Sequence, residues 1–223
     1  MVRAVWKSSC RIAKPRDIVA LNLLWRKHDK NLEDRQFIIA NAVTGDTITN
    51  IYRHEVNNER CRIAFGPITQ PGTYHLYHLP YTPEYKDFSA RKYLTKEKEP
   101  EKEWLNRTGL TGGELQLDDL PKCSVDVIQA RSEFHFFYPM EVPALKDEIQ
   151  KYVSKYDEPY LVFREDRIRP IKMLDALPLI WLQSQPSLRF RGTDCRNEYY
   201  ALQSGVYASK VSLKDLKVNF LNW

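Results

Sequence analysis

The sequence contains no uninterrupted apolar run near the roughly 20 residues that a membrane-spanning helix needs. The longest apolar stretch, residues 18–24, has the length of a strand and is interrupted by Asn22. The N-terminal segment also lacks the apolar core of a signal peptide, because charged side chains divide it: Lys7, Arg11, Lys14, Arg16 and Asp17. We therefore expect no membrane partner. The sequence leaves open whether the protein is cytoplasmic or the trimmed form of a secreted or periplasmic one.

Cysteine is scarce, with four residues in 223, and they are far apart at positions 10, 61, 123 and 195. No pair has the Cys-x-x-Cys spacing of a zinc knuckle or a redox motif, so we expect neither a metal site nor another cofactor. Several disulfide connectivities are possible in principle. Because Cys61 and Cys123 adjoin strand-like segments, we instead expect independent thiols, most of them buried.

An excess of charge of one sign is also lacking. The chain has 34 lysines and arginines against 29 acidic residues, for a formal net charge of +5. Basic residues cluster at residues 164–169 and 189–196, but acidic side chains are interleaved with them. A nucleic-acid interface would present a face or stripe of one sign. The pattern therefore favours a mildly basic, solvated surface and no nucleic-acid partner.

The motifs of common catalytic sites are missing. The chain has no glycine-rich phosphate loop, no Gly-x-Ser-x-Gly elbow and no His-Glu-x-x-His zinc motif. His75 and His78 are three residues apart, but they lie in a predicted strand. Their side chains there point to opposite faces, so they are poorly placed to hold one metal ion.

Adjacent acidic residues occur at three places, residues 33–34, 147–148 and 165–166. Two carboxyl groups could serve glycosidic chemistry if one of them were held neutral as an acid. The second pair begins a short predicted helix on its solvated face. Arg164 and Arg167 flank the third pair and favour its ionised form. We therefore expect no catalytic residue.

The sequence does contain many short alternating segments separated by turn signals. In residues 73–79, for example, Tyr74, Leu76 and His78 share one face of a predicted strand. Strands are predicted at residues 4–6, 18–25, 36–42, 47–52, 61–65, 73–79, 124–130, 134–138, 160–163 and 179–182. The last predicted element is a hairpin whose two strands are residues 199–207 and 216–220.

Only residues 145–156 show the apolar stripe of an amphipathic helix. Residues 82–121 form a long insertion that carries a charge run at residues 96–103, and we expect Trp104 to pin it by burying against the sheet. The pattern predicts an all-β fold, a single antiparallel β-sandwich domain over residues 1–223 with one short helix and a long charged insertion.

Three tryptophans are candidates for carbohydrate binding, because an exposed indole ring can stack on a sugar: Trp25, Trp104 and Trp181. Tryptophans of this kind are more often core residues or residues that pin a loop. The three residues make a glycan a candidate partner without indicating which glycan.

Several segments together resemble a known family. They are residues 65–67 and 71–81 (FGP and PGTYHLYHLPY), 137–143 (FYPMEVP), 165–173 (EDRIRPIKM) with Leu177, Pro178 and Trp181 behind it, and 194–208 (DCRNEYYALQSGVYA). In this order the set resembles the N-terminal β-sandwich domain that precedes the catalytic barrel in glycoside hydrolase family 123-like proteins.

The resemblance implies a connection to the hydrolysis of β-linked N-acetylgalactosamine. In that family the acetamido group of the substrate acts as the nucleophile, assisted by an Asp-Glu pair in the barrel. None of the acidic pairs of this chain lies in a barrel-strand context, so no catalytic residue is carried over.

Three functions are therefore open. The first is a non-catalytic N-terminal module that packs against a downstream catalytic domain, which the resemblance implies. The second is a stand-alone carbohydrate-binding module, suggested by the aromatic content. The third is a protein-interaction domain, suggested by the lack of any site chemistry.

Overall fold

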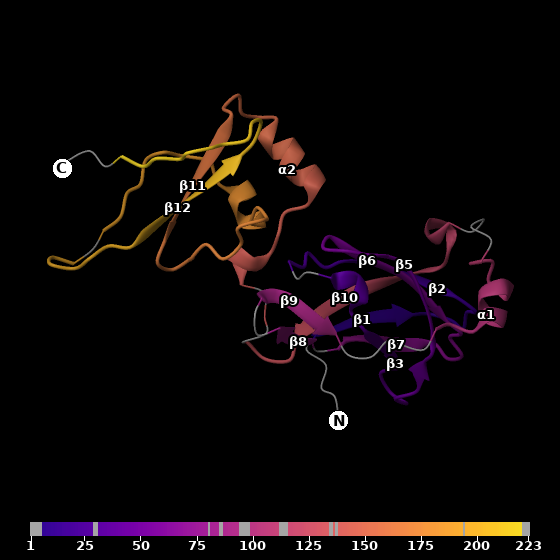
Figure 1. Ribbon diagram of the computed structural model, residues 1–223. Coiled ribbons are helices and arrows are strands. Elements are labelled where there is room, and N and C mark those ends of the chain that lie inside the picture. Colours follow the sequence, from indigo (N-terminus) through magenta and orange to yellow (C-terminus); the bar gives the residue numbers. More distant parts are fainter. Residues whose placement is uncertain are drawn as a thin grey trace. The chain divides into compact units, whose positions relative to one another are not determined.

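A computed structural model describes residues 6–28, 31–79, 81–84, 87–93, 99–111, 116–133, 136, 138–193 and 195–219. Internal contacts divide the chain into two compact units, Met1–Phe137 (unit 1) and Tyr138–Trp223 (unit 2) (Figure 1). Each unit has a hydrophobic core of its own. That residues 1–223 form a single domain stays a prediction.

Unit 1 is built on an eight-stranded sheet in the order β4-β3-β7-β1-β10-β2-β6-β5. Its strands are β1 (Trp6–Ile12), β2 (Val19–Leu24), β3 (Phe37–Asn41), β4 (Thr47–Ile48), β5 (Asn50–Val56), β6 (Arg60–Gly66), β7 (Gly72–His78) and β10 (Lys122–Ala130). All neighbouring strands pair antiparallel except β10 and β2, which pair parallel. The edge strands β4 and β5 are separated in sequence by Thr49 alone, so the sheet curls until it is nearly barrel-shaped.

Alternation along the strands decides which side chains fill the interior of this sheet. On β2 and β6 the opposed pairs Val19–Phe65, Leu21–Ile63 and Leu23–Cys61 all point inward. The outward pair between them, Ala20 and Ala64, is small. The inner face is therefore continuous and apolar, as a half-buried strand requires.

The later part of the insertion packs on the outer face of the same two strands, through Trp104, Leu110, Leu117 and Leu120. It contains β8 (Tyr81–Glu84), β9 (Asp87–Tyr93), the short helix α1 (Lys102–Arg107) and the 3-10 turn η2 (Leu117–Asp119). Trp104 of α1 is 1% exposed and belongs to a second core cluster with Ala20 and Ala64. The prediction that Trp104 pins the insertion is confirmed, although α1 itself was not expected.

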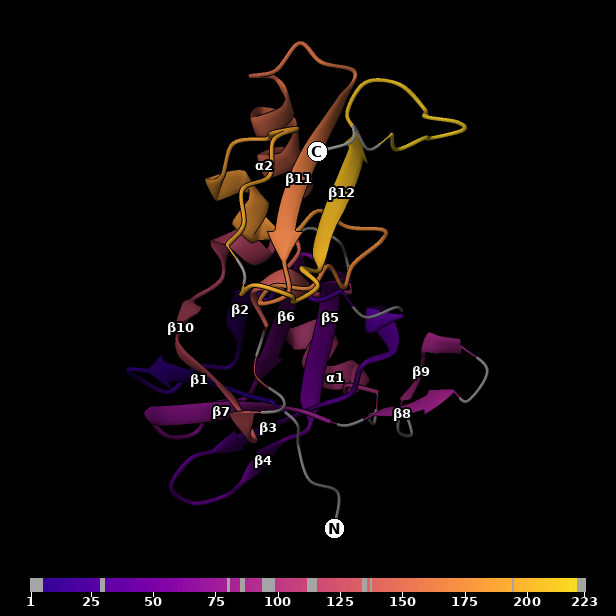
Figure 2. The same cartoon turned by 90° about the vertical axis from the view of Figure 1, so that its left-hand side faces the viewer.

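Unit 2 contains η4 (Pro139–Glu141), α2 (Lys146–Val153), β11 (Tyr160–Asp166), η5 (Leu179–Gln183) and β12 (Leu202–Ala208). Strands β11 and β12 run antiparallel side by side (Figure 2). Their inner face packs on α2 and η5 around Met140, Tyr152, Leu161, Phe163, Leu177 and Trp181. The helix predicted at residues 145–156 is confirmed.

Two predicted elements of unit 2 are wrong. Strand β12 pairs with β11 and not with residues 216–219, where Leu216 and Val218 are 63% and 75% exposed and offer no buried face for pairing. Residue 220 of the predicted hairpin lies outside the described residues. Residues 179–182 are a 3-10 turn and not a strand. The turn begins after Pro178, whose carbonyl accepts the Trp181 N–H at 3.0 Å, and it directs Trp181 into the core.

The strands predicted at residues 18–25, 36–42, 61–65, 73–79 and 124–130 agree with the sheet, whereas the strand predicted at 47–52 is divided at Thr49 between β4 and β5. The prediction of a mostly β, largely antiparallel fold with one main helix is confirmed. Two predicted strands include residues that the structure does not describe. Residues 4–5 lie outside the described residues, and so do 134, 135 and 137 of the strand predicted at 134–138. Phe136 and Tyr138 of that segment are not in a strand.

Candidate functional site

The three candidate tryptophans lie in three separate buried places. Trp25, Trp104 and Trp181 are 3%, 1% and 5% exposed. Each indole N–H donates a hydrogen bond inside the protein, to the Asn57 carbonyl at 2.6 Å, to the Asp17 carbonyl at 3.1 Å and to Glu165 Oε1 at 2.7 Å, respectively. The structure does not bring them together, and each of the three indoles is almost wholly buried. Their role in carbohydrate binding stays a prediction.

Glu165 is the most constrained polar side chain of unit 2. It lies on the inner face of β11 and is 5% exposed, although carboxylates are rarely buried without partners. Its Oε1 accepts the Trp181 N–H, and its Oε2 lies 3.3 Å from Arg169 Nε. Both oxygens are thus engaged, which makes Glu165 a fixed anchor between the core and the surface.

Besides its hydrogen bond to Glu165, Trp181 is held by close packing on both strands of unit 2. Its indole stacks on Phe163 with ring centroids 4.5 Å apart and an interplanar angle of 4°. Gly205 lies opposite Phe163 in the β11–β12 register, and a Cβ there would collide with the Trp181 ring. Glycine at this position therefore leaves the space that the indole fills.

An open depression of about 450 Å³ lies at the free edge of β11, the edge that does not pair with β12. We call it the arginine depression. It is lined by Arg164, Glu165, Asp166, Arg169, Arg189, Phe190, Arg191 and Tyr200. The lining residues include four arginines and two acidic residues, an excess of two positive charges.

Local hydrogen bonds position the walls of the arginine depression. The Ser187 N–H donates to the Val162 carbonyl at 2.9 Å, which fastens the 187–191 segment along β11. The Arg189 N–H donates to Ser187 Oγ at 3.1 Å. On the other side, the Ile168 N–H donates to Asp166 Oδ1 at 2.8 Å in the turn that ends β11.

Two aromatic rings form a wall of the same depression. Phe190 and Tyr200 lie with ring centroids 5.5 Å apart. Gly192 lies against both rings, since a Cβ there would approach each of them to 2.8 Å. The guanidinium carbon of Arg167 lies 6.0 Å from the Tyr200 ring centroid. The pair is thus packed in place before any ligand arrives.

A second open depression in unit 2, of about 560 Å³, lies beside β12. Its lining mixes apolar groups with few hydrogen-bonding ones: Ile171, Met173, Leu174, Asp175, Ala176, Leu177, Trp181, Gln203, Ser204, Gly205, Val206 and Tyr207. Gln203 is already used, because its Oε1 accepts the Ile171 N–H at 2.6 Å. This depression has less charge with which to select a ligand than the arginine depression.

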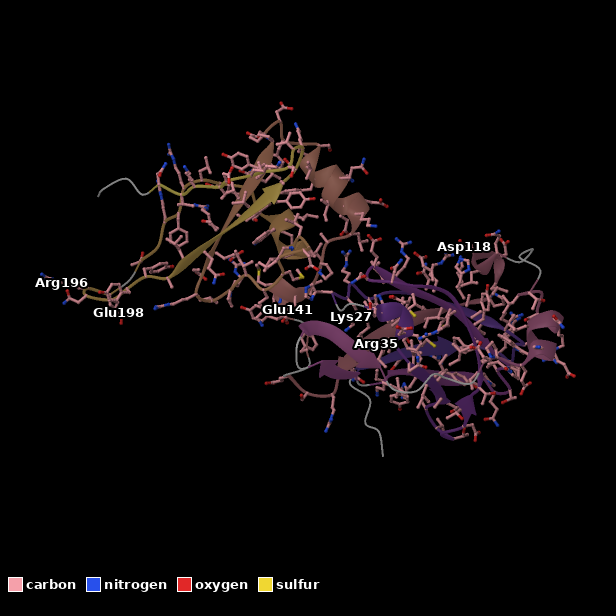
Figure 3. The ribbon with its side chains drawn as sticks, in the orientation of Figure 1. Lys27, Arg35, Asp118, Glu141, Arg196 and Glu198 are labelled. Carbon is pink, nitrogen blue, oxygen red and sulfur yellow. The ribbon has the colours of Figure 1, made fainter. Side chains whose placement is uncertain are left out.

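The buried polar centre of unit 1 is His78. Its Nε2 lies 3.3 Å from Ser8 Oγ, and its ring packs edge-on against Phe37. Burial, followed by the positive charges of Arg35 and Lys27, lowers the pKa of His78 well below its ordinary value. Lys27 and Arg35 are labelled in Figure 3 and are themselves buried. The neutral imidazole is a packing element here.

The side chain of His75 lies on the face of β7 opposite to that of His78, as predicted. Its Nδ1 is 3.0 Å from Ser9 Oγ. Burial and then the charge of Lys7 lower the pKa of His75. Among the residues that the structure describes, no group of three or more His, Cys, Asp or Glu side chains could hold a metal ion. Nor, within that same set, does any helix have the length and apolar character needed to cross a membrane.

None of the four cysteines is in a disulfide, and three of them are buried, as predicted; the exposed one is Cys195. Cys10 and Cys123 come from the neighbouring strands β1 and β10 and form a hydrogen-bonded pair. That hydrogen bond lowers the pKa of Cys10 and raises the pKa of Cys123, which burial raises further.

The three acidic pairs have structural surroundings. Glu33 and Asp34 belong to η1 (Leu32–Asp34). Asp147 and Glu148 are in the first turn of α2, where Glu148 Oε2 accepts the Leu145 N–H at 2.9 Å. The pair at 165–166 straddles β11, so its two side chains leave on opposite faces. Glu165 and Asp166 both line the arginine depression, but both oxygens of Glu165 are engaged by Trp181 and Arg169.

Comparison with known proteins gives one match. Residues 3–131, more than half of the chain, match the family model for the glycoside hydrolase 123, N-terminal domain. No curated protein matches, and no solved structure matches. The matched residues cover nearly all of unit 1, whereas Glu165 and the arginine depression lie beyond them.

Proposed function

The chain belongs to the glycoside hydrolase 123 N-terminal domain family, and from this premise we propose that it is a non-catalytic module that supports a glycoside-hydrolase barrel. The observation that carries the proposal is the family match over residues 3–131. The family's activity, hydrolysis of β-linked N-acetylgalactosamine, would then belong to the partner domain.

The surroundings of the acidic residues support a non-catalytic role. A glycosidase needs two carboxyl groups that face one substrate, one of them available as an acid. Glu165 has both oxygens engaged by Trp181 and Arg169, and Glu148 caps the first turn of α2. Neither carboxylate is free to approach a glycosidic oxygen.

Hydrolysis of an aryl β-N-acetylgalactosaminide by the purified chain tests this directly. We expect a rate equal to that of buffer. The matched variant Glu165→Gln guards against a contaminating enzyme, because it should leave a contaminant's activity unchanged. Turnover by the chain that disappears in Glu165→Gln, while the variant keeps its folded spectrum, would contradict the proposal.

Carbohydrate binding is the second candidate function. The observation that favours it is the arginine depression with its packed aromatic wall, Phe190 and Tyr200. The buried tryptophans do not contribute to this argument. A binding module and a supporting module are compatible, since one unit can hold a partner domain while the other holds glycan.

A further inference from the structure

We propose that the arginine depression binds an acidic saccharide, that is, a sugar that carries a carboxylate or a sulfate ester. The site lies in unit 2, outside the residues that match the family model, and the proposal does not depend on a catalytic partner. Charge, hydrogen bonding and shape each support it.

The charge of the depression is not balanced by the protein itself. Of its four arginines, Arg169 is paired with Glu165. Within the described part of the chain, Arg164, Arg189 and Arg191 make no ion pair, and all three are exposed. Three exposed arginines that line one hollow attract an anion, and planar guanidinium forks match the oxygens of a carboxylate or a sulfate.

The anchoring of Arg169 distinguishes this hollow from a random basic surface. Glu165 is buried and is fixed by the Trp181 N–H at 2.7 Å, and it in turn holds Arg169 Nε at 3.3 Å. One of the four cations is thus positioned by a chain of contacts that begins in the core. A preorganised donor loses less conformational entropy when a ligand binds.

The other lining groups favour a saccharide over a nucleic acid. Asp166 is part of the lining, and its carboxylate can accept hydrogen bonds from sugar hydroxyls. The depression is open but local, about 450 Å³ in volume, whereas a nucleic-acid interface is a face or stripe of one charge sign. Phe190 and Tyr200 provide an apolar wall for a sugar ring.

The test is calorimetric titration of the full chain with defined probes. One is an oligogalacturonate, which carries carboxylates alone, and another is a sulfated neutral oligosaccharide, which carries sulfate esters alone. The uncharged parent oligosaccharide, inorganic sulfate and a single-stranded oligonucleotide complete the set. We expect saturable binding of at least one acidic saccharide, weakened by added salt. Which of the two binds identifies the anionic group.

Variants localise the site. The double variant Arg189→Gln/Arg191→Gln should bind the acidic saccharide about tenfold or more weakly, because it loses two charged hydrogen-bond donors. Arg196→Gln is the matched control, since Arg196 is an exposed arginine at the outer end of the loop that leads to β12, and it does not line the depression (Figure 3). It should bind as the unchanged chain does. Arg164→Gln, on β11, provides a second loss-of-binding variant if the loop variant is misfolded.

The proposal is overturned by several clear results. These are no binding of either acidic saccharide, equal binding by the Arg189→Gln/Arg191→Gln variant, or equal binding of the uncharged parent. Inorganic sulfate that binds as tightly as the saccharide would reduce the site to a simple anion site and contradict saccharide recognition. Tighter binding of the oligonucleotide would overturn the choice of a saccharide.

Discussion

Gly205 and Trp181 close the core of unit 2. We predict that Gly205→Ala lowers the free energy of unfolding by about 1–3 kcal/mol, because the added methyl group meets the rigidly stacked Trp181 ring. Urea denaturation measures the change. Ser204→Ala is the control, since Ser204 is an exposed neighbour on the same strand and should change stability by less than about 0.5 kcal/mol. Equal stability of Gly205→Ala and the unchanged chain would contradict this packing.

His78 predicts a pH dependence of stability. Its pKa is lowered in the folded protein, so below its ordinary value of 6.5 the unfolded chain binds a proton that the folded protein does not. Stability is therefore retained above that pH and falls as the pH drops, with a limiting slope of about 1.4 kcal/mol per pH unit.

Urea denaturation between about pH 7 and pH 5 measures this slope. His78→Gln, which cannot take up the proton, should show a flatter dependence even if it is less stable at neutral pH. His54→Gln, a change at an exposed histidine, should keep the original slope. A slope that is the same in all three proteins would contradict the assignment to His78.

Helix α1 holds the charged insertion to unit 1 through one side chain. Trp104 is 1% exposed over the Ala20–Ala64 pair, and its removal leaves a cavity there. We predict that Trp104→Ala lowers the free energy of unfolding by about 3–5 kcal/mol. Limited proteolysis should then cut within residues 99–111, which the unchanged chain protects. Leu105→Ala, next to Trp104 and half-buried, should cost less. Unchanged proteolysis of Trp104→Ala would contradict the pinning role.

The elements that local pattern predicts well are those whose signal is contained in their own residues. Strand β7 alternates between buried and half-buried residues, and α2 has an apolar stripe, so both were predicted. The pairing of β12 with β11 could not be predicted, because a partner about 40 residues away leaves no local trace. Residues 216–220 alternate like a strand but bury nothing where they are described, and alternation alone does not form a sheet.

The candidate site was harder to predict than the fold. The sequence indicates aromatic residues that could stack on sugar, and the structure places the three chosen tryptophans in cores because their area is what stabilises those cores. The arginines of the depression were visible as two basic clusters at residues 164–169 and 189–196. Their convergence depends on the fastening of the 187–191 segment to β11, which no local pattern specifies.

The two units have separate cores, and this predicts that they unfold separately. Residues 1–137 contain both clusters that line the eight-stranded sheet, and the third cluster lies wholly in unit 2. We expect the fragment 1–137 to fold alone, with a cooperative urea transition and a β-rich circular dichroism spectrum. Aggregation or a non-cooperative transition of this fragment, while the full chain unfolds in one step, would contradict the independence of unit 1.

We propose that this family member supports a catalytic barrel and hydrolyses no glycoside itself. The most direct measurement is the half-life of activity of a separately produced glycoside hydrolase 123 barrel at raised temperature, with and without a molar excess of the full chain. Because a partner that binds only the folded barrel stabilises it by mass action, we predict a longer half-life with the chain and no hydrolysis by the chain alone. An unchanged half-life together with hydrolysis by the chain alone would contradict the claim.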